Sequence, residues 1–375
     1  MLCHGGGGGS TRAAIDLATA LDRRGHNVLL ISLGRPRWLP PSHLRHAIIR
    51  CDRGSSLRLD AGWAAATIDA IAHDLATICR REEIGLLHLH YGLPFVAAAT
   101  VARTILGHAA PPIVATLHGT DITAALRDPA VGRALGAGLR HAAAVTTVST
   151  AYADLLRGSA DLPAAVVVPN FIPDDRLVPA PRHRRTGRRP PTMIHVSNFR
   201  DVKDIRGLAR AFIATRRRCR CRLLLVGDGP GWRGIADLLR GWPADVRMLG
   251  FRRDVPALLR QADLLLLTSR EESFSLAALE AMAAGLPVIA PRVGGLPEVI
   301  RDGVGGRLFH PGRIADAGAK LLALLGSPIM LRRLAIGARS RAACFREADV
   351  VARYEGLYRS VLGRHPVAAP TRAIR

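Results

Sequence analysis

Short apolar runs alternate with helical stretches through the first half of the 375-residue chain, and this alternation constrains the fold more than any other feature. The runs that fit buried strands are residues 28–32, 86–90, 113–117, 145–149 and 165–168. Helical patterns at 10–24 and 64–82 lie between them. Connected strand, helix and strand units of this length predict a doubly wound parallel sheet, whose ligands bind beyond the carboxyl ends of the strands.

The second half repeats this organisation after a break rich in Pro and Arg between Ile172 and Thr192. Its expected strands are residues 193–197, 222–226, 246–249, 263–268 and 288–290. We therefore predict two Rossmann-like α/β domains, since the length and the 49% hydrophobic content allow two cores. The expected boundaries are 1–175 for the first domain, 176–191 for a linker, 192–345 for the second domain, and 346–375 for a final segment whose helix, 346–361, packs back on the first domain.

Basic residues outnumber acidic ones, with 53 Lys plus Arg against 30 Asp plus Glu and a formal charge of +23. Nucleic acid is the first partner that such a charge suggests, but aromatic residues make up only 4% of the chain and no DNA- or RNA-binding motif is present. We expect no specific nucleic acid partner and interpret the excess mainly as compositional bias. The charge would still attract anionic substrates and, weakly, an anionic membrane surface.

The six cysteines show no paired zinc spacing, and the sequence has neither a secretion signal nor a long apolar span. These features predict a protein of the reducing cytoplasm. No Asp-x-Asp sequence occurs, which argues against the usual carboxylate clamp for a divalent metal, so we expect no metal and no cofactor. The sequence does not decide the oligomeric state, and a homodimer is left open.

An anion site is predicted where the strand 263–268 gives way to a helix. Ser273 is a suitable N-cap for a helix over 274–284, which Gly285 would close. The first amides of such a helix have no intrahelical partners and lie at its positive dipole end. Residues 273–276 are therefore expected to hold a diphosphate.

Two acids flank this predicted anion site, Glu272 just before the helix and Glu280 about two turns into it. One acid would reach a sugar and the other a ribose diol, which is nucleotide-sugar chemistry. The alternative is that both are solvated acids beside an ordinary helix. Phe274 and the Gly285-Leu-Pro turn stand in a fixed order around the pair, and this context favours the functional interpretation.

Lys203 is informative because Lys occurs only at positions 203 and 320 in a chain that otherwise uses Arg. A retained Lys suggests a site that needs a compact point charge instead of a planar fork, although chance is the alternative. Arg200 and Lys203 follow the first strand of the second domain, so both should leave the sheet at its ligand edge. Cations there would neutralise the charge that develops on a departing nucleoside diphosphate.

Two further motifs lie at predicted strand ends. The segment Leu223–Pro230 runs from a strand into a glycine turn at Gly227, which would allow close approach of the backbone to a ligand. His118 ends a strand and is followed by Gly-Thr-Asp, which brings small and polar groups to the same edge. For an isolated histidine, the alternative is a structural side chain whose hydrogen bonds are satisfied within the fold.

Taken together, these segments resemble the retaining glycosyltransferases of family 4, whose GT-B fold has two facing Rossmann-like domains with a cleft between them. The segment from Glu272 to Glu280 and the sequence Gly-Gly-Leu-Pro-Glu at 294–298 are shared by many of these enzymes. Other segments are similar to one branch, the N-acetyl-α-D-glucosaminyl L-malate synthases of bacillithiol biosynthesis. These segments are His88-Leu-His-Tyr-Gly-Leu-Pro94, Thr116-Leu-His-Gly-Thr-Asp-Ile-Thr123, Pro169-Asn-Phe-Ile172 and His195-Val-Ser-Asn-Phe-Arg200.

The resemblance implies transfer of N-acetylglucosamine from UDP-N-acetylglucosamine (UDP-GlcNAc) to the hydroxyl of L-malate, with the α configuration retained and no metal. It assigns Glu280 to the ribose hydroxyls, Glu272 to the sugar hydroxyls and His118 to the sugar near its C6 hydroxyl. The diphosphate would be held by Lys203, Arg200 and the amides of Ser275 and Leu276. His118, Arg200, Lys203 and Glu272 are the implied catalytic residues, and the remaining implied donor-binding residues are Gly9, Asn198, Gly227, Ser273 and Phe274.

On the acceptor side, the resemblance implies that Tyr91, Thr120 and the loop at Gly9 and Ser10 face the malate. The chain departs from the family pattern in three ways. Only Met1-Leu-Cys3 and His4 precede the glycine loop, so the first strand is expected to be truncated, and five successive glycines would be floppy when empty. Ser275 replaces the family's glycine, and its side chain would either crowd the phosphate or hydrogen-bond to it, which puts the donor affinity at risk.

Two other functions are kept beside this one. The first is a related retaining transferase with another small acceptor, such as inositol phosphate or a secondary-metabolite intermediate. The acceptor loops decide that choice, and their acceptor preference is poorly predicted from sequence. The second is a basic nucleic-acid-binding protein on a degenerate transferase scaffold, which would bind polynucleotides in a salt-dependent way and transfer no sugar. The presence of Glu272, Glu280 and Lys203 speaks against the second.

Overall fold

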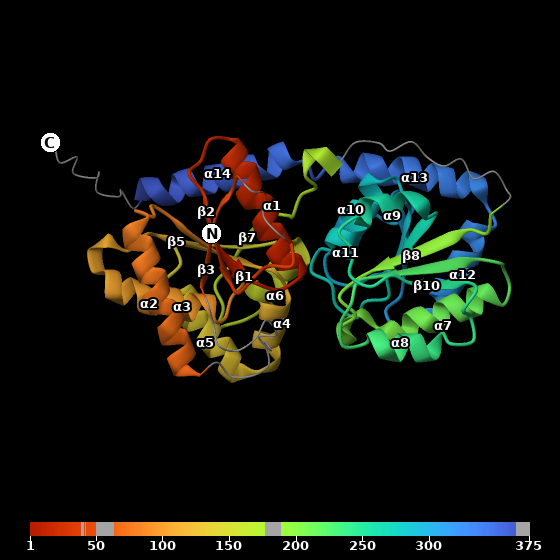
Figure 1. The fold of residues 1–375 in the computed structure, drawn as a ribbon, viewed down its shortest axis with the longest axis horizontal. Coiled ribbons are helices and arrows are strands. Elements are labelled where there is room, and N and C mark those ends of the chain that lie inside the picture. Colours follow the sequence, from red (N-terminus) through yellow and green to blue (C-terminus); the bar gives the residue numbers. More distant parts are fainter. Residues whose placement is uncertain (39–40, 42, 50–63, 177–188, 365–375) are drawn as a thin grey trace. The chain divides into compact units, whose positions relative to one another are not determined.

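The computed structural model describes residues 1–38, 41, 43–49, 64–176 and 189–364. They form two compact units, which Figure 1 shows. Unit 1 comprises Met1–Pro169 and the C-terminal segment from Ala348, and unit 2 comprises Asn170–Glu347. Each unit is built on a parallel sheet with connecting helices, so the predicted fold class of two doubly wound α/β domains is confirmed.

The described residues of unit 1 form a seven-stranded parallel sheet in the order β3-β2-β1-β4-β5-β6-β7. Its strands are β1 (Leu2–His4), β2 (Leu29–Leu33), β3 (Arg45–Ile49), β4 (Leu87–His90), β5 (Ile113–Leu117), β6 (Ala144–Thr147) and β7 (Val166–Val167). The strand order reverses between β1 and β4, and ligands of doubly wound sheets bind at the carboxyl ends beside such a switch point. The residues that follow β1, β4 and β5 therefore lie at the expected ligand edge.

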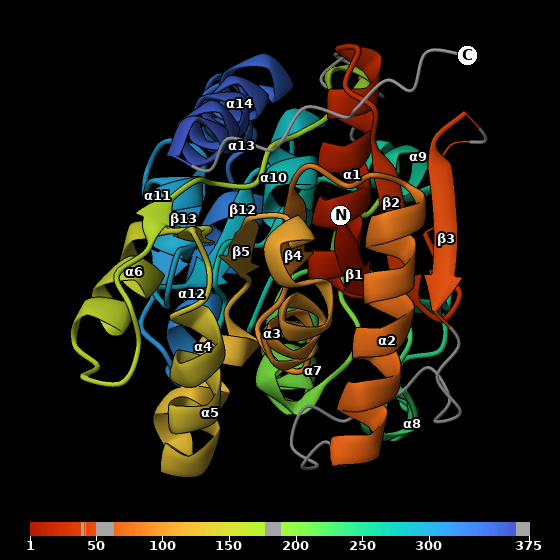
Figure 2. The same ribbon diagram turned by 90° about the vertical axis from the view of Figure 1, so that its left-hand side faces the viewer.

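Helices cover the sheet of unit 1. They are α1 (Gly9–Arg23), α2 (Ala65–Arg81), α3 (Phe95–Leu106), η1 (Gly107–Ala109), α4 (Thr120–Arg127), α5 (Pro129–Leu139), α6 (Thr150–Arg157) and α14 (Glu347–Arg364). Figure 2 shows α2 and α3 side by side, and they bury Leu75 and Phe95 in one apolar core with Leu89 of β4. The last helix, α14, is tied to α1 by the ion pair between Glu355 and Arg24, whose Nε lies 2.8 Å from a carboxylate oxygen.

The three-residue strand β1 is short, as its sequence predicted, yet it lies in the interior of the sheet between β2 and β4. Leu2, Cys3 and His4 pair with residues of β2, and Leu2 also pairs with Leu89 of β4. Leu2 and Cys3 are completely buried. Neighbours on both sides thus compensate for the small number of residues in this strand, and they fix the direction in which the glycine loop leaves the sheet.

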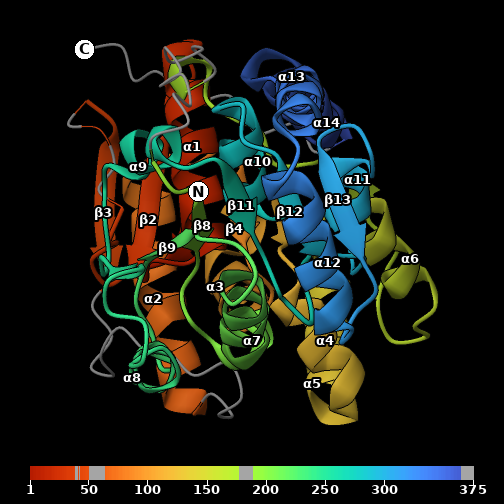
Figure 3. The ribbon, with the colours of Figure 1, turned by 90° about the vertical axis from the view of Figure 1, so that its right-hand side faces the viewer.

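Unit 2 contains, among its described residues, a six-stranded parallel sheet in the order β10-β9-β8-β11-β12-β13, seen in Figure 3. Its strands are β8 (Thr192–Val196), β9 (Arg222–Val226), β10 (Val246–Met248), β11 (Leu264–Leu266), β12 (Val288–Pro291) and β13 (Gly306–Phe309). Here the strand order reverses between β8 and β11. The two segments that carry Lys203 and Glu272 follow these two strands, which places both at the ligand edge of the sheet.

The helical elements of unit 2 are η2 (Asp174–Arg176), η3 (Asp201–Lys203), α7 (Ile205–Arg216), α8 (Trp232–Leu238), α9 (Val255–Gln261), α10 (Leu276–Ala283), α11 (Leu296–Ile300), α12 (Ile314–Leu325) and α13 (Pro328–Ala342). The helices α7 and α12 lie side by side and bury Phe212 and Leu321 in one core with Leu264 of β11. Within the described part of the chain, no single helix has the length and apolar character to cross a membrane, and the one bent pair that passes on length and composition is α12 with α13.

Several sequence expectations need correction. The strands β3 and β13 are absent from the expected set, because both are edge strands with polar or glycine residues that break the apolar pattern. The expected domain boundary at 175 lies instead after Pro169, and Arg176, expected in the linker, belongs to unit 2. Residues 177–188 of the expected linker lie outside the described residues.

Candidate functional site

Lys203 and Glu272 form an ion pair at the ligand edge of unit 2. The Nζ atom of Lys203 lies 2.6 Å from Oε2 of Glu272, and the side chains are 18% and 13% exposed. Ser269 donates its hydroxyl to the same carboxylate oxygen at 3.3 Å. A pair so little exposed is screened weakly by solvent, so a polyanion that approached Lys203 would compete directly with Glu272 for the ammonium group.

Two contacts hold Lys203 in this place by its backbone. Thr268, at the end of β11, donates its hydroxyl to the carbonyl oxygens of Lys203 and Asp204 at 3.0 and 3.1 Å. The amide of Arg270 donates to the carbonyl of Val202 at 2.7 Å. The short helix η3 is therefore tied to the neighbouring strand end, and this juxtaposition of β8 and β11 brings together an acid and a lysine that are 69 residues apart.

The N-terminus of α10 differs from the sequence prediction by two residues. Ser275, not Ser273, is the N-cap, because its hydroxyl accepts a hydrogen bond from the amide of Ala278 at 3.3 Å. Ser275 has φ +77°, a left-handed conformation that glycine adopts without strain. This turn lets the chain enter the helix directly after Phe274, which is buried. Gly285, with φ +77°, follows the end of the helix as predicted.

This cap decides which amides of α10 are available. The hydroxyl of Ser275 accepts from the amide of Ala278, so that amide is engaged, while the hydroxyl keeps its own proton as a donor. The amides of Leu276 and Ala277 precede the first intrahelical hydrogen bonds. They supply donors at the positive end of the helix dipole, a few residues after Glu272.

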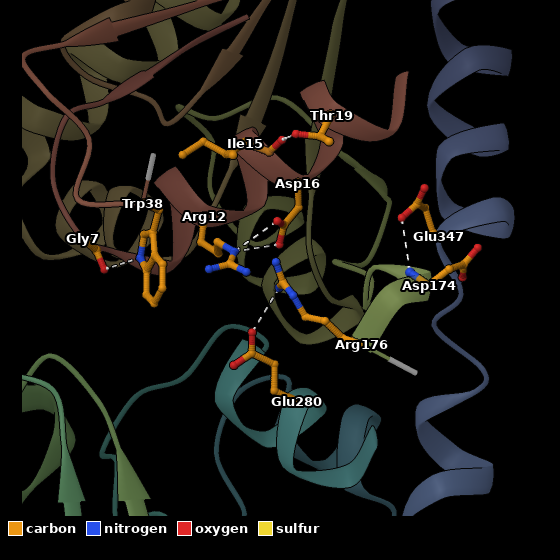
Figure 4. A network of polar contacts seen from close by, with 10 residues as sticks. All are labelled: Gly7, Arg12, Ile15, Asp16, Thr19, Trp38, Asp174, Arg176, Glu280 and Glu347. Carbon is orange, nitrogen blue, oxygen red and sulfur yellow. Dashed lines mark hydrogen bonds and ion pairs between the residues drawn. The ribbon is translucent and has the colours of Figure 1, made fainter. Parts of the chain in front are cut away.

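Glu280 lies on α10 and is paired with Arg176, a residue that the sequence pattern had assigned to the linker. Nη1 of Arg176 lies 3.3 Å from Oε1 of Glu280, and both side chains are about one-fifth exposed. Figure 4 shows Arg176 reaching Glu280 from η2. The two residues are 104 positions apart. The guanidinium thereby orients the carboxylate, a group of the kind that accepts hydrogen bonds from hydroxyl groups.

The loop after β8 is shaped by a buried histidine. Nδ1 of His195 donates to the carbonyl of Leu266 at 2.9 Å, so Nε2 accepts from the hydroxyl of Ser197 at 2.8 Å, and Ser197 in turn accepts from the amide of Phe199. Burial lowers the pKa of His195 to about 4, so the ring is neutral at pH 7. This chain of hydrogen bonds fixes the loop that carries Asn198 and Arg200.

The glycines after β9 pack against this same loop. A Cβ atom on Gly227 would lie 1.8 Å from the carbonyl oxygen of Ser197, and one on Gly229 would lie 1.8 Å from that of Asn198. Gly227 was predicted to allow close approach to a ligand. In the structure its missing side chain allows close approach to the Ser197 carbonyl instead, so its contribution is to the shape of the loop.

Asn198 and Arg200 differ in exposure. The Arg200 side chain is exposed. The Oδ1 atom of Asn198 is buried without a hydrogen-bond partner among the described residues, although buried amide oxygens are normally paired. This unused acceptor lies in the loop that leads to Lys203.

Unit 1 presents a second set of candidate residues, which begins with the glycine loop. Gly9 and Ser10 form the first turn of α1 instead of the predicted loop, and Gly8 is the N-cap without a side-chain hydrogen bond. A Cβ atom on Gly5 would lie 2.1 Å from the carbonyl oxygen of Leu33, which explains glycine at this position. The first amides of α1 have no intrahelical partners and lie at its positive end.

Contacts from outside the loop hold the glycines in place. Nε1 of Trp38 donates to the carbonyl of Gly7 at 3.2 Å, and Arg12 lies over the Trp38 ring at 4.5 Å, as Figure 4 shows for the hydrogen bond. Thr11 donates its hydroxyl to the carbonyl of His4 at 3.1 Å. Aromatic and hydroxyl side chains therefore contact the glycine loop on both of its flanks.

Asp121 organises the turn after β5. Its carboxylate accepts from the amides of His118 at 3.0 Å, Gly119 at 2.7 Å and Ile122 at 3.0 Å, and also from Gly92 at 3.2 Å. Burial raises its pKa, and these four hydrogen bonds oppose that rise. The motif residue thus acts as an anchor that joins the ends of β4 and β5, and it positions His118 and Thr120, the first residue of α4.

Four histidines lie together at the carboxyl ends of β1, β4 and β5, with His88 and His90 buried and His4 and His118 half-buried, and we call these four residues the histidine layer. The rings of His88 and His90 are 4.2 Å apart, and those of His90 and His118 are 5.4 Å apart. Burial lowers the pKa of His4 to about 4 and that of His118 to about 3, and it lowers the pKa values of His88 and His90 well below the ordinary value. All four are neutral at pH 7.

Tyr91, expected to face the acceptor, is 4% exposed and packs edge-on against His4, with ring centroids 4.9 Å apart. Its φ of +132° turns the chain sharply out of β4. Within the described ranges, no group of three or more His, Cys, Asp or Glu residues is arranged to hold a metal ion.

Two family models match the chain, one for each unit. "Glycosyltransferase Family 4" matches residues 7–176, and "Glycosyl transferases group 1" matches residues 190–327. Among solved structures, Anabaena HepE in complex with UDP and glucose has a TM-score of 0.79 at 21% identity, with 96% of this chain and 98% of that chain covered. Sucrose-phosphate synthase from Thermosynechococcus elongatus has a TM-score of 0.79 at 22% identity, with 96% of each chain covered. These likenesses show the GT-B glycosyltransferase fold.

The sequence relatives agree with this assignment. N-acetyl-alpha-D-glucosaminyl L-malate synthase of Bacillus anthracis is 32% identical over 379 residues, which covers 96% of each protein. D-inositol 3-phosphate glycosyltransferase of Segniliparus rotundus is 33% identical over 167 residues, which covers 41% of this chain and 36% of that protein. A likeness that spans nearly the whole of both proteins shows the family. The chain is an enzyme that belongs to the family-4 glycosyltransferases, together with the malate synthase that it matches from end to end.

Proposed function

We propose that this glycosyltransferase moves N-acetylglucosamine from UDP-GlcNAc to the hydroxyl of L-malate and retains the α configuration. The observation that carries the proposal is the pairing of Lys203 with Glu272 beside the capped N-terminus of α10. A cation, free helix amides and an acid together match a diphosphate with an attached sugar. The end-to-end similarity to the Bacillus anthracis malate synthase supports the choice of donor and acceptor.

In this proposal the donor exchanges partners with the resting ion pair. The diphosphate takes the ammonium group of Lys203 from Glu272, and the amides of Leu276 and Ala277 bind phosphate oxygens. The carboxylate of Glu272 then accepts hydrogen bonds from sugar hydroxyls. The exchange leaves neither partly buried charge without a partner, which matters because an unpaired charge out of water is costly.

The ribose is assigned to Glu280. A carboxylate accepts two parallel hydrogen bonds, and Arg176 already contacts Oε1 and orients the group. Binding at Glu280 fixes the nucleoside, and this binding energy positions the distant anomeric carbon.

The transfer step needs no side chain as a nucleophile. The bond between C1 of the sugar and the β-phosphate oxygen breaks, and the malate hydroxyl oxygen bonds to C1 on the same face. The hydroxyl proton passes to the departing phosphate oxygen, and UDP leaves. Lys203 and Arg200 neutralise the charge that accumulates on this phosphate as the bond breaks, which lowers the barrier more than it strengthens ground-state binding.

An anionic acceptor fits the residues of unit 1. The unpaired amides of the first turn of α1, at Gly9 and Ser10, are suited to a carboxylate. The formal charge of +23 would draw a dicarboxylate by long-range attraction, at a rate that falls with salt. We also propose a cytoplasmic enzyme that needs no metal, since cations take the part that a divalent ion plays elsewhere. A homodimer and a weak attraction to anionic membranes belong to the proposal as well.

The experiment is UDP release from UDP-GlcNAc, measured with and without L-malate, in buffer containing EDTA. We expect release to be much faster with both substrates than with the donor alone. Equal release with and without malate between pH 6 and 9 would refute the acceptor. A parallel series with D-inositol 3-phosphate tests the alternative acceptor, and faster release with inositol phosphate than with malate would replace the proposal.

A matched control exists for the role of Lys203, because Lys320 is the other lysine of the chain. Lys320 lies in α12, where it pairs with Asp316. We expect Lys203→Ala to slow UDP release strongly and Lys320→Ala to leave it unchanged. Equal effects of the two substitutions would show that the loss comes from stability or net charge and not from contact with the donor.

A further inference from the structure

His90, to which no role has been given so far, forms a hydrogen bond with His118. Nδ1 of His90 lies 3.2 Å from Nε2 of His118, and the two rings are nearly parallel, with 26° between their planes. His90 is 1% exposed, and its Nε2 atom is buried without a hydrogen-bond partner among the described residues. His118 is therefore the described hydrogen-bond partner of the His90 ring.

Only two proton arrangements are compatible with this contact, because both rings are neutral and one nitrogen must donate while the other accepts. In the first, Nδ1–H of His90 donates to Nε2 of His118, so His118 carries its own proton on Nδ1. In the second, Nε2–H of His118 donates to His90, so the proton of His90 moves to its buried Nε2. The second arrangement leaves an N–H buried without an acceptor, which is rarer in proteins than an unused lone pair.

The His90 ring packs against His88, whose own ring is fixed by hydrogen bonds. The His88 ring lies 4.2 Å from it, and His88 is held at both nitrogens, by Tyr358 through Nδ1 at 2.7 Å and by Thr116 through Nε2 at 2.7 Å. Tyr358 comes from α14, whose Tyr354 also contacts Thr116 at 3.4 Å. The C-terminal helix thus fixes the plane of His88, and His88 restricts the plane of His90.

We propose that His90 is a positioning residue that holds His118 in the tautomer with the proton on Nδ1. The expected effect on activity rests on the proposed function, in which His118 lies near the C6 hydroxyl of the sugar. The tautomer itself does not depend on that function. In that tautomer Nδ1 carries the proton and Nε2 accepts from His90, so His118 does not act as a base toward the substrate. The contact explains why a strand histidine with no expected ligand is buried here.

The test compares two substitutions of His90. His90→Asn keeps an N–H at the position of Nδ1, whereas His90→Phe keeps a ring against His88 but removes the donor. The exposed His108 in η1 supplies the control variant His108→Phe. The first readout is the tautomer of His118, read from proton–nitrogen correlation spectra of protein labelled with nitrogen-15 in histidine. The second readout is kcat and KM for UDP-GlcNAc.

We expect the wild type, His90→Asn and His108→Phe to show His118 protonated on Nδ1, and His90→Phe to show a mixture with the Nε2 form. We expect kcat of His90→Phe to fall about fivefold, the size of one hydrogen bond, with KM nearly unchanged and with recovery in His90→Asn. A wild-type spectrum with His118 protonated on Nε2 would overturn the proposal, and so would a His90→Phe spectrum with Nδ1 fully protonated. If His90→Phe does not fold, the wild-type spectrum alone still distinguishes the two tautomers.

The spectra need no substrate, so they separate this inference from the proposed function. If UDP-GlcNAc proves not to be the donor, the tautomer of His118 is still read directly. If the tautomer is as proposed but kcat of the His90→Phe variant is unaffected, the positioning role in the reaction is overturned while the donor assignment stands.

Discussion

Replacement of Ser275 at the start of α10 separates two opposing effects of this residue on stability. Ser275 has φ +77°, where an L side chain costs about 1–2 kcal/mol relative to an unstrained conformation. Its hydroxyl also caps the helix through the amide of Ala278 at 3.3 Å. Ser275→Gly removes the strain and loses only a few tenths of a kcal/mol, about 0.3, of capping, whereas Ser275→Ala keeps the strain and loses about 1 kcal/mol of capping.

Glycine also increases the entropy of the unfolded chain, at a cost of about 0.5–1 kcal/mol. The net expectation is that Ser275→Gly stabilises unit 2 by about 0.5 kcal/mol and that Ser275→Ala destabilises it by about 1 kcal/mol. For a unit of this size, that corresponds to a rise of roughly 1–2 °C and a fall of roughly 2–4 °C in Tm. Differential scanning calorimetry measures both shifts.

The same pair of variants tests the donor side. The family that the chain resembles has glycine at this position and binds its donor without this hydroxyl, so loss of the hydroxyl should leave the affinity for UDP within about threefold in titration calorimetry. The reasoning would be refuted by a glycine variant less stable than the alanine variant, because the strain would then be absent. It would also be refuted by a tenfold loss of UDP affinity in the glycine variant, because the hydroxyl would then bind the phosphate.

The remaining predictions concern the donor site, the loop glycines and pH. Glu280→Ala should raise the KM for UDP-GlcNAc about tenfold or more, while Lys203→Ala should lower kcat about 100-fold. Steady-state kinetics measure both, and a kcat effect at Glu280 with a KM effect at Lys203 would contradict the assignment. Gly229→Ala should lower Tm in calorimetry, because a Cβ atom would lie 1.8 Å from the carbonyl oxygen of Asn198, and an unchanged Tm would show that the loop is not packed as described. Burial lowers the pKa values of the histidine layer, so below about pH 6.5 the unfolded chain binds more protons than the folded chain. The free energy of unfolding should therefore fall in this range by up to about 1.4 kcal/mol per histidine and pH unit. Tm of unit 1 should therefore drop between about pH 7.5 and pH 5.5, and a flat profile would be inconsistent with the neutral histidine layer.

Much of the fold could be predicted from the sequence where apolar runs are continuous. The strands at 113–117 and 222–226 were expected with the bounds that the structure shows, because buried parallel strands need uninterrupted apolar residues. The edge strands β3 and β13 were not predicted, because edge strands tolerate polar residues that interrupt an apolar run. The bounds of the helix at 274–284 were displaced, since the conformation of Ser275 depends on the turn that joins it to buried Phe274.

The part of the candidate site that follows the ends of the strands was predictable, because the carboxyl ends of parallel strands meet at one edge of a sheet. Lys203 and Glu272 were both expected at the ligand edge of the second domain, and the structure pairs them. Arg176 was missed because its Pro- and Arg-rich surroundings are typical of a linker, and its contact with Glu280 spans 104 residues. His90 stood in a quoted motif without a role, because only the three-dimensional register of β4 and β5 brings its ring to His118.

The measurement that tests the central claim most directly is identification of the product formed from UDP-GlcNAc and L-malate by the purified enzyme in the presence of EDTA. Proton NMR of the reaction mixture should show one new anomeric signal with the small coupling of an α-linked N-acetylglucosamine, together with an equimolar amount of UDP and a shifted malate methine signal. A β-coupled anomeric signal, free N-acetylglucosamine with unchanged malate, or no product until a divalent metal is added would contradict the account.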